Sequence, residues 1–146
     1  MSVPSQATPG TVKDVMMFGR PVTELGSPMA VMLDAEDSIE EALNFMMLKQ
    51  MGCILATTGE EMVGILTERD ILLKVVSDHP DLSTIKISGI MTPNPESFRE
   101  TDPISSVIMK MQAGGYRHAP IVDAANHPIG IISVKDIIQF IANNIG

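Results

Sequence analysis

Aromatic side chains and cysteine are both scarce in this chain of 146 residues. It contains no Trp, one Tyr, four Phe and a single cysteine, Cys53. One cysteine cannot form an internal disulfide and cannot by itself hold a zinc ion, so the cysteine count fits a reducing compartment and indicates no metal chemistry. With so few rings, aliphatic side chains and the twelve Met, whose flexible thioethers fit irregular gaps, have to fill the core.

Excess positive charge and long apolar runs are missing as well. The formal net charge of −8 argues against a general nucleic-acid or anionic-membrane surface, because both need clustered Lys and Arg. No apolar run approaches the length of a membrane span, and the first residues lack the hydrophobic stretch of a signal peptide. We therefore expect a soluble, cytoplasmic protein with neither nucleic acid nor membrane as its primary partner.

A nine-residue pattern is present twice. Residues 64–72 read GILTERDIL and residues 130–138 read GIISVKDII, so a glycine, two aliphatics, a hydroxyl residue and an aspartate recur 66 positions apart. The surroundings recur too: an apolar stripe at helical spacing occupies 39–48 and again 104–111. After each stripe come two short apolar runs joined by a polar turn, which predict a hairpin. The chain is therefore a duplication.

Each half is predicted to be a β-α-β-β-α unit, whose first short strand lies at 30–33 or 96–98, before the first helix. A unit of this size buries too little surface alone, so we expect an α+β fold in which two copies pack sheet to sheet with pseudo-twofold symmetry. We divide the chain into a mobile N-terminal tail at 1–11, a first domain with its lead-in strand at 12–80, and a linker, second lead-in strand and second domain at 81–146.

The residues before the first helix of each unit predict how that helix begins. Ser38 with Glu41 three positions later has the spacing of a capping box. In the second copy Asp102 is predicted as the N-cap and Pro103 as the first helical residue.

The duplicated hydroxyl and aspartate have two interpretations. In the first, Thr67 or Ser133 caps the helix that follows, and Asp70 or Asp136 faces the positive end of its dipole. In the second, the exposed N–H groups of the same turn hold phosphate and the carboxylate accepts two hydrogen bonds from the vicinal diol of a ribose. Gly64 or Gly130, three residues before the hydroxyl residue, would leave room for a flat ligand to approach the strand. The two interpretations are compatible, and spacing alone leaves both open.

Two such units resemble a tandem pair of cystathionine-β-synthase (CBS) domains, also called a Bateman module. The resemblance covers residues from about 28 to 144 and rests on the motif G-h-h-[ST]-x-x-D (h is aliphatic) that closes each copy, on TERD at 67–70 and on IMTPNP at 90–95. VKDVM at 12–16 resembles ISGIM at 87–91, the short strand that precedes such a domain. The resemblance implies that the pair binds AMP, ADP, ATP or S-adenosylmethionine as a regulatory ligand between its repeats and requires no cofactor.

Carried over to this sequence, the resemblance implies two clefts. The first would be formed by Thr67, Arg69, Asp70, Ile65, Asn94, Pro95, Ser97, Arg117, His118 and Ala119. The second would be formed by Ser133, Lys135, Asp136, Ile131, Met29, Ala30, Met51, Gly52 and Cys53. The first cleft has three basic side chains near the expected phosphate and the second has one, so we favour the first cleft for a charged nucleotide. The insertion at residues 18–27 is expected to reshape or cover the second cleft.

No catalytic or metal-binding constellation is visible in the sequence. It has no phosphate-binding G-x-x-x-x-G-K-[ST] loop, and His79 and His127 have no metal-ligand spacing. We expect a non-enzymatic energy-sensing module that forms a homodimer, as the family usually does, and signals to an unidentified downstream protein. The alternatives are a ligand-independent structural or interaction module, whose T-x-x-D sites are caps only, and an enzyme acting on nucleotides.

Overall fold

The computed structural model describes residues 18–25, 31–75 and 81–145. The expected tail at 1–11 and the first expected lead-in strand at 12–16 lie outside these described residues.

The first half of the chain has the predicted order of elements, and the second half has it without the first strand. The first half contains β1 (Met32–Asp34), α2 (Ile39–Lys49), β2 (Cys53–Thr58), β3 (Glu61–Thr67) and α3 (Glu68–Lys74). The second half contains α4 (Ile104–Gly114), β5 (His118–Val122), β6 (Pro128–Ser133) and α5 (Val134–Asn144). Short 3₁₀ turns, η1 (Val22–Leu25) and η3 (Ile87–Gly89), precede the two halves, and strand β4 (Thr92–Pro93) follows η3.

The two sheets are built alike but differ in size. The first has the order β1-β2-β3-β4, with β1 parallel to β2 and the other pairs antiparallel. The second pairs β5 with β6 in antiparallel fashion. The strand predicted at 96–98 is reduced to a single parallel bridge between Phe98 and Ile121, in the position that β1 takes beside β2.

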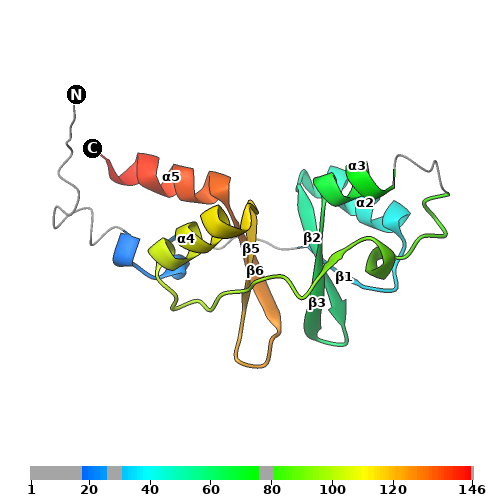
Figure 1. The fold of residues 1–146 in the computed structure, drawn as a ribbon, viewed down its shortest axis with the longest axis horizontal. Coiled ribbons are helices and arrows are strands. Elements are labelled where there is room, and N and C mark those ends of the chain that lie inside the picture. Colours follow the sequence, from blue (N-terminus) through cyan, green and yellow to red (C-terminus); the bar gives the residue numbers. More distant parts are fainter. Residues whose placement is uncertain (1–17, 26–30, 76–80, 146) are drawn as a thin grey trace.

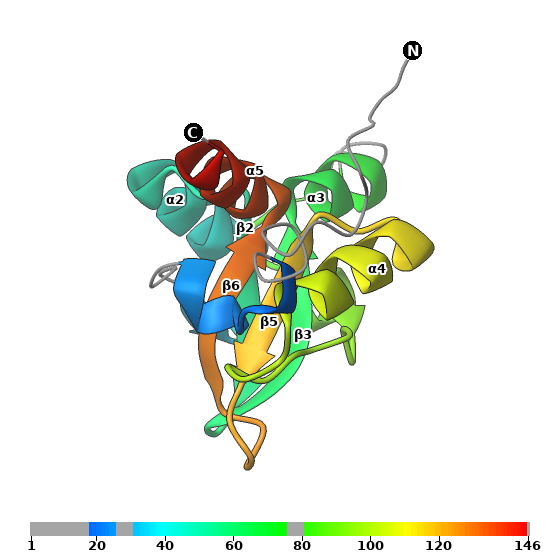
Figure 2. The ribbon, with the colours of Figure 1, turned by 90° about the vertical axis from the view of Figure 1, so that its left-hand side faces the viewer.

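The sheets face each other in the centre of the molecule, and the helices cover their outer sides (Figure 1). The view at right angles agrees, because α4 and α5 lie in front of β5 and β6, with β2 and β3 behind them (Figure 2). Apolar side chains fill the space between the sheets, with Leu55 and Met62 from the first and Val122 and Ile131 from the second. The predicted α+β fold with two repeats packed sheet to sheet is confirmed.

A hydrogen-bonded contact joins the β5–β6 turn to the first repeat. The Met62 N–H donates to the carbonyl of Asn126 over 3.0 Å, and the Asn126 side-chain amide donates to the carbonyl of Met62 over 3.0 Å. Asn126 takes the left-handed backbone region, with φ of 64°, which asparagine tolerates better than most residues. The two repeats are therefore fixed to each other near their hairpin turns.

The segment before the first repeat packs on the second repeat. Val22 is 2% exposed and lies in the core that contains Ile104 and Phe140. The Ile104 N–H donates to the carbonyl of Arg20 over 2.8 Å. The part of the expected insertion that the structure describes, residues 18–25, therefore contributes to the second hydrophobic core.

The segment before the second repeat packs, in turn, on the first. Ile87 has no exposed surface and lies in the core that contains Ile39 and Leu66. Its N–H donates to the carbonyl of Asp37 over 2.8 Å. Each lead-in segment therefore packs on the repeat that does not follow it directly in the chain, so the two segments cross over.

The predicted start of α4 is wrong by one residue. Pro103 is the N-cap, and the helix begins at Ile104 without a side-chain cap. The Asp102 carboxylate instead accepts the Arg99 N–H over 2.8 Å, so a local turn occupies the oxygen that would have capped the helix. The predicted cap of α2 is present, because the Ser38 hydroxyl accepts the Glu41 N–H over 3.1 Å.

Candidate functional site

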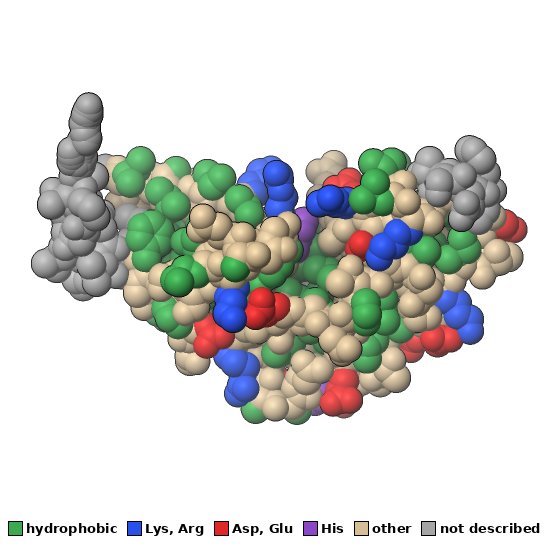
Figure 3. Space-filling model, viewed as in Figure 1, with side chains coloured by type: hydrophobic (Ala, Val, Ile, Leu, Met, Phe, Trp, Pro, Cys, Tyr) green, Lys and Arg blue, Asp and Glu red, His purple; other side chains and the backbone are tan. Residues whose placement is uncertain are grey.

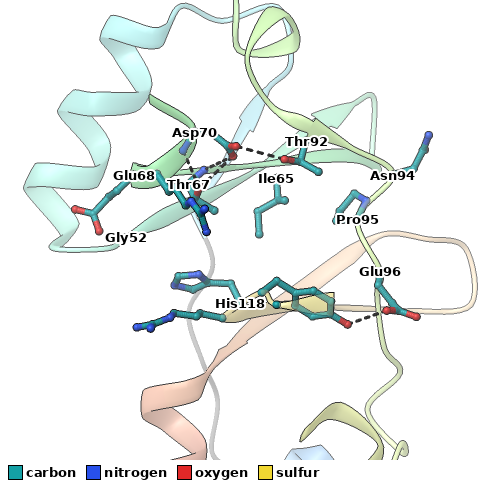
Figure 4. A pocket seen from close by; sticks show the side chains of 14 residues that line it. Gly52, Ile65, Thr67, Glu68, Asp70, Thr92, Asn94, Pro95, Glu96 and His118 are labelled. Carbon is teal, nitrogen blue, oxygen red and sulfur yellow. Dashed lines mark hydrogen bonds between the residues drawn. The ribbon is translucent and has the colours of Figure 1, made fainter. Parts of the chain in front are cut away.

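A cleft of about 700 Å³ lies between the two repeats. Figure 3 shows a hollow at the boundary of the two halves, with Lys or Arg side chains on both of its sides and a histidine within it. The residues that line the cleft are Gly52, Ile65, Thr67, Glu68, Arg69, Asp70, Thr92, Asn94, Pro95, Glu96, Gly115, Tyr116, Arg117 and His118. One wall comes from β3, α3 and β4 of the first repeat, and the other comes from the start of β5 in the second repeat (Figure 4).

The structure brings together most of the residues expected in the first cleft. All of them line the cleft except Ser97 and Ala119. Ala119 has no exposed surface and belongs to the core of the second repeat.

Asp70 lies in a capping box at the start of α3. One of its carboxylate oxygens accepts the Thr67 N–H over 3.0 Å and the Thr67 hydroxyl over 3.1 Å, and that hydroxyl accepts the Asp70 N–H over 3.1 Å. The other oxygen lies 3.4 Å from both the Lys74 ammonium and the Thr92 hydroxyl. The helix-cap interpretation of T-x-x-D is therefore confirmed, while the ribose interpretation stays a prediction. The Asp70 side chain remains 14% exposed, within the wall of the cleft (Figure 4).

Basic side chains gather at one end of the cleft. Arg69 lies in the first turn of α3, and on the facing wall Arg117 directly precedes β5, which begins at His118. Within the described residues, the ion pairs closer than 4 Å involve neither arginine. Two guanidinium groups are thus available to an anion at this end.

Gly52 leaves room for the Glu68 carboxylate at this basic end of the cleft. A Cβ added to it would lie 2.8 Å from the Glu68 carboxylate and 3.8 Å from Nε2 of His118. Burial lowers the pKa of His118, and Arg117 lowers it further, while the Asp136 and Glu68 carboxylates act in the opposite direction. The imidazole therefore favours its neutral form.

A hydrogen-bonded chain of side chains borders the cleft on the side away from His118 (Figure 4). The Tyr116 hydroxyl donates to Oε1 of Glu96 over 2.8 Å, and the Lys110 ammonium lies 3.2 Å from Oε2 of Glu96. The hydrogen bonds from Tyr116 and Lys110 lower the pKa of Glu96. Burial, followed by the Glu96 carboxylate, raises the pKa of Tyr116. This end of the cleft holds a neutral phenol and an ionised carboxylate.

Several cleft residues were not expected there. They are Glu68, Thr92, Glu96, Gly115 and Tyr116, together with Gly52, which we had assigned to the second cleft. Glu68 and Tyr116 are adjacent in the chain to residues predicted for the cleft, so the sequence could have indicated them. Nothing in the sequence indicates Gly52, because the role of this glycine depends on how Glu68 and His118 approach from different repeats.

The expectation that Gly64 leaves room for a flat ligand is wrong. A Cβ added to Gly64 would lie 2.9 Å from Cγ of Met91, so the methionine already fills this space. Strand β4 pairs with β3 at Pro93 and Gly64, and this pairing brings Met91 over the glycine. Gly64 therefore makes room for the Met91 side chain and not for a ligand.

The second motif is also a capping box. One Asp136 oxygen accepts the Ser133 N–H over 2.8 Å and the Ser133 hydroxyl over 3.0 Å. Met29 and Ala30, expected in the second cleft, lie outside the described residues. Lys135 is exposed in the first turn of α5.

The remaining residues expected in the second cleft lie close to the core between the sheets. Cys53 and Ile131 are buried there, and Met51 packs against them. Burial raises the pKa of the Cys53 thiol to about 12. This cysteine is therefore a small apolar core residue at neutral pH.

Comparison with known proteins identifies the family. A family model described as CBS domain matches residues 12–77 and again residues 87–143. The chain belongs to the CBS domain family. The CBS domain-containing protein CBSCBSPB1 of Arabidopsis thaliana is 30% identical over 119 residues, which are 81% of this chain and 21% of that protein. The chain spans only about a fifth of the length of the curated relatives it matches first.

Solved CBS structures share the fold of this CBS pair. The CBS domain pair of protein MJ0100, in complex with 5′-methylthioadenosine and S-adenosyl-L-methionine, is 24% identical, with a TM-score of 0.77 over 86% of this chain and 98% of that one. The CBS domain protein PAE2072 of Pyrobaculum aerophilum, complexed with AMP, is 23% identical, with a TM-score of 0.73 over 84% of this chain and 98% of that one.

The described part of this CBS pair has neither a membrane-spanning helix nor a group of metal ligands. No helix in residues 18–25, 31–75 or 81–145 is long and apolar enough to cross a membrane. In the same ranges, no three His, Cys, Asp or Glu side chains are grouped so that they could hold a metal ion.

Proposed function

We propose that this CBS pair is a regulatory module that binds an adenosine-containing ligand in the first cleft. One observation carries the proposal: a single cleft built by both repeats holds the Asp70 carboxylate, two arginines without an ion-pair partner among the described residues, and apolar side chains. The CBS pairs of MJ0100 and PAE2072, which bind S-adenosyl-L-methionine, 5′-methylthioadenosine or AMP, support the class of ligand.

The charges of the cleft favour a ligand that carries phosphate. The ribose diol is proposed to bind at Asp70, whose less occupied oxygen faces Thr92. The phosphate is proposed to lie between Arg69 and Arg117, beside His118. Hydrogen bonds to charged groups contribute about 1.5–3 kcal/mol each, so a few of them decide selectivity among small ligands. We therefore expect AMP, ADP or ATP to bind more tightly than S-adenosylmethionine, which has a cationic sulfonium.

Ligand binding is proposed to signal through the relative position of the repeats. Because the two walls of the cleft come from different repeats, a ligand stabilises whichever arrangement it binds better. The helices also expose apolar side chains at equivalent positions of the two repeats, Leu72 (63% exposed) on α3 and Ile138 (60%) on α5. These side chains support the proposal of a homodimer. The downstream protein is unidentified, and a cytoplasmic location stays a prediction.

A thermal-shift panel of AMP, ADP, ATP, S-adenosylmethionine and NADH tests the ligand, with two matched variants. Asp70→Asn keeps a capping oxygen but removes the charge, and it is expected to weaken nucleotide binding about tenfold, as a charged hydrogen bond of about 1.5 kcal/mol predicts. Asp136→Asn makes the same change in the second capping box and is expected to leave binding in the first cleft intact. Light scattering of the same samples gives the number of chains per particle.

The competing proposal is a ligand-independent structural or interaction module. The capping box favours it, since Thr67 already occupies one Asp70 oxygen. It would be supported if no adenosine compound raised the melting temperature, or if Asp70→Asn lowered stability without changing affinity. An enzyme acting on nucleotides would instead convert ATP to product during the incubation, which chromatography of the same samples detects.

A further inference from the structure

The helices of the first repeat expose more apolar surface than those of the second. Helices α2 and α3 lie on the outer side of the first sheet (Figure 1). On α2, Met47 and Leu48 are 78% and 75% exposed, and Leu72 and Leu73 of α3 are exposed as well. Counted from the first residue of each helix, the equivalent positions of α4 and α5 are occupied by Gln112, Ala113, Ile138 and Gln139. Among the described helices, exposed apolar surface is therefore concentrated on the first repeat.

Charges on α2 are arranged symmetrically about an aromatic side chain. Glu41, Phe45 and Lys49 are spaced four residues apart, so they share one face of the helix, and all three are exposed. Glu41 lies in the first turn and Lys49 in the last. In the ranges 18–25, 31–75 and 81–145, the ion pairs closer than 4 Å include neither of these two charged side chains. These three residues, which we call the α2 stripe, thus present an acid, an apolar centre and a base.

The α2 stripe is complementary to itself. When two copies of α2 lie antiparallel with Phe45 at the centre, Glu41 of each copy falls beside Lys49 of the other. A two-fold axis produces this arrangement, because it brings the same surface of both copies together. Antiparallel pairing also opposes the two helix dipoles. Since the chain has a net charge of −8, two copies repel each other over much of their surface, and a contact with matched charges is favoured.

Helix α4 of the second repeat has no such pattern. The positions equivalent to the α2 stripe are Ser106, Lys110 and Gly114. The first turn of α4 has no acid and its last turn has no base. Two copies of α4 paired in the same way would bring Lys110 against Lys110, and α2 paired with α4 would bring Phe45 against Lys110. Helix α2 therefore fits a second α2 better than it fits α4.

We propose that the two copies of the homodimer meet through the first repeat of each, with α2 antiparallel to the second α2 and the two-fold axis near Phe45. The contact buries the exposed leucines of α2 and α3, and burial of apolar surface stabilises it. This inference rests on the proposed homodimer and adds its orientation, in which each repeat lies beside the same repeat of the other copy.

Thiol cross-linking of the full chain tests the orientation. Phe45→Cys places a thiol at the expected axis, and Lys110→Cys places one at the equivalent position of α4. A bis-maleimide is expected to join Phe45→Cys copies to each other, whereas contact between unlike repeats would join them only to Lys110→Cys copies in a mixture. The wild type is the control, because its single cysteine, Cys53, is buried.

Charge reversal tests the complementarity of the α2 stripe. Glu41→Lys and Lys49→Glu each place like charges together at both ends of the contact. Each is expected to raise the dissociation constant of the dimer about fivefold, as small changes at two exposed ion pairs predict. The double variant Glu41→Lys with Lys49→Glu restores opposite charges, so its dissociation constant should return toward that of the wild type. Sedimentation over a concentration series measures the constants, and circular dichroism of dilute samples checks that the helices remain folded.

The outcomes separate this inference from the proposed function. If the chain dimerises but Phe45→Cys copies do not cross-link with each other, or if the double variant dissociates as readily as the single ones, the proposed orientation is overturned and the homodimer stands. If the wild type is a monomer at every concentration, the homodimer and its orientation are both overturned. Nucleotide binding in the first cleft is judged separately, by the thermal-shift panel.

Discussion

Among single residues, His118 shows most directly how the two repeats influence each other. Its imidazole belongs to the second repeat and faces Glu68 of the first across the space left by Gly52. Asp136, also of the second repeat, and Glu68 favour the protonated form, whereas burial and Arg117 disfavour it. Burial is the largest of these influences, so the pKa of His118 is lowered in the folded protein.

This direction predicts how stability depends on pH. Between the lowered pKa and the ordinary value of about 6.5, the unfolded chain binds more protons than the folded one, so the free energy of unfolding falls as the pH is lowered through this range. The contribution of His118 is fully present above about pH 6.5. We expect His118→Gln to flatten the pH dependence of urea unfolding between about pH 7 and about pH 5. The other histidines are unchanged in the variant, so parallel curves for the two proteins would contradict the prediction.

At the scale of secondary-structure elements, β4 joins the first sheet through a very close contact. It pairs with β3 at Gly64, and Met91 lies where a side chain on Gly64 would be. Glycine costs backbone entropy in a strand, and here it is required because any Cβ would displace the methionine.

The β3–β4 contact predicts a coupled pair of substitutions. Gly64→Ala is expected to lower the free energy of unfolding by about 1–3 kcal/mol through overpacking. Combining it with Met91→Ala makes room for the new methyl group, so the double variant should be more stable than the sum of the single changes predicts. Urea unfolding of all four proteins measures the coupling, and strictly additive effects would argue against the close contact.

In the whole molecule, the crossed lead-in segments make the two repeats depend on each other. Val22 completes the core of the second repeat, and Ile87 completes the core of the first. The hydrogen bonds between Met62 and Asn126 and the core between the sheets also join the two repeats. We therefore predict that both repeats unfold together in one cooperative transition.

The crossing can be tested by hydrogen exchange. Ile87→Ala is expected to cost about 2–5 kcal/mol, as deletion of a buried aliphatic side chain does. The amide protection lost should be greatest in α2 and β2 of the first repeat, although Ile87 precedes the second. Val22→Ala should act mainly on α4 and β5, and Ser88→Ala, a change at an exposed neighbour, serves as the control. The crossed arrangement would be contradicted if Ile87→Ala reduced amide protection mainly in the second repeat and Val22→Ala mainly in the first.

The sequence by itself determined the features that depend on a few neighbouring residues or on repetition. The two T-x-x-D motifs predict helix starts because a hydroxyl and a carboxylate three positions apart satisfy the N–H groups of a first turn, and both capping boxes are present at Asp70 and Asp136. Repetition of the hydrophobic pattern predicts the paired β-α-β-β-α fold, since each unit buries too little surface alone. Most of the residues that the resemblance assigns to the first cleft line one cleft in the structure, and their binding of a nucleotide stays a prediction.

Only the tertiary structure decided which side chains fill the spaces between distant segments. Met91 covers Gly64, Glu68 fills the space beside Gly52, and each lead-in segment packs on the other repeat. Each of these contacts joins residues that are separated by more than a helix in the chain, so neither propensity nor periodicity encodes it. They follow from packing two sheets face to face without leaving empty space, which is a property of the assembled core and not of any local pattern.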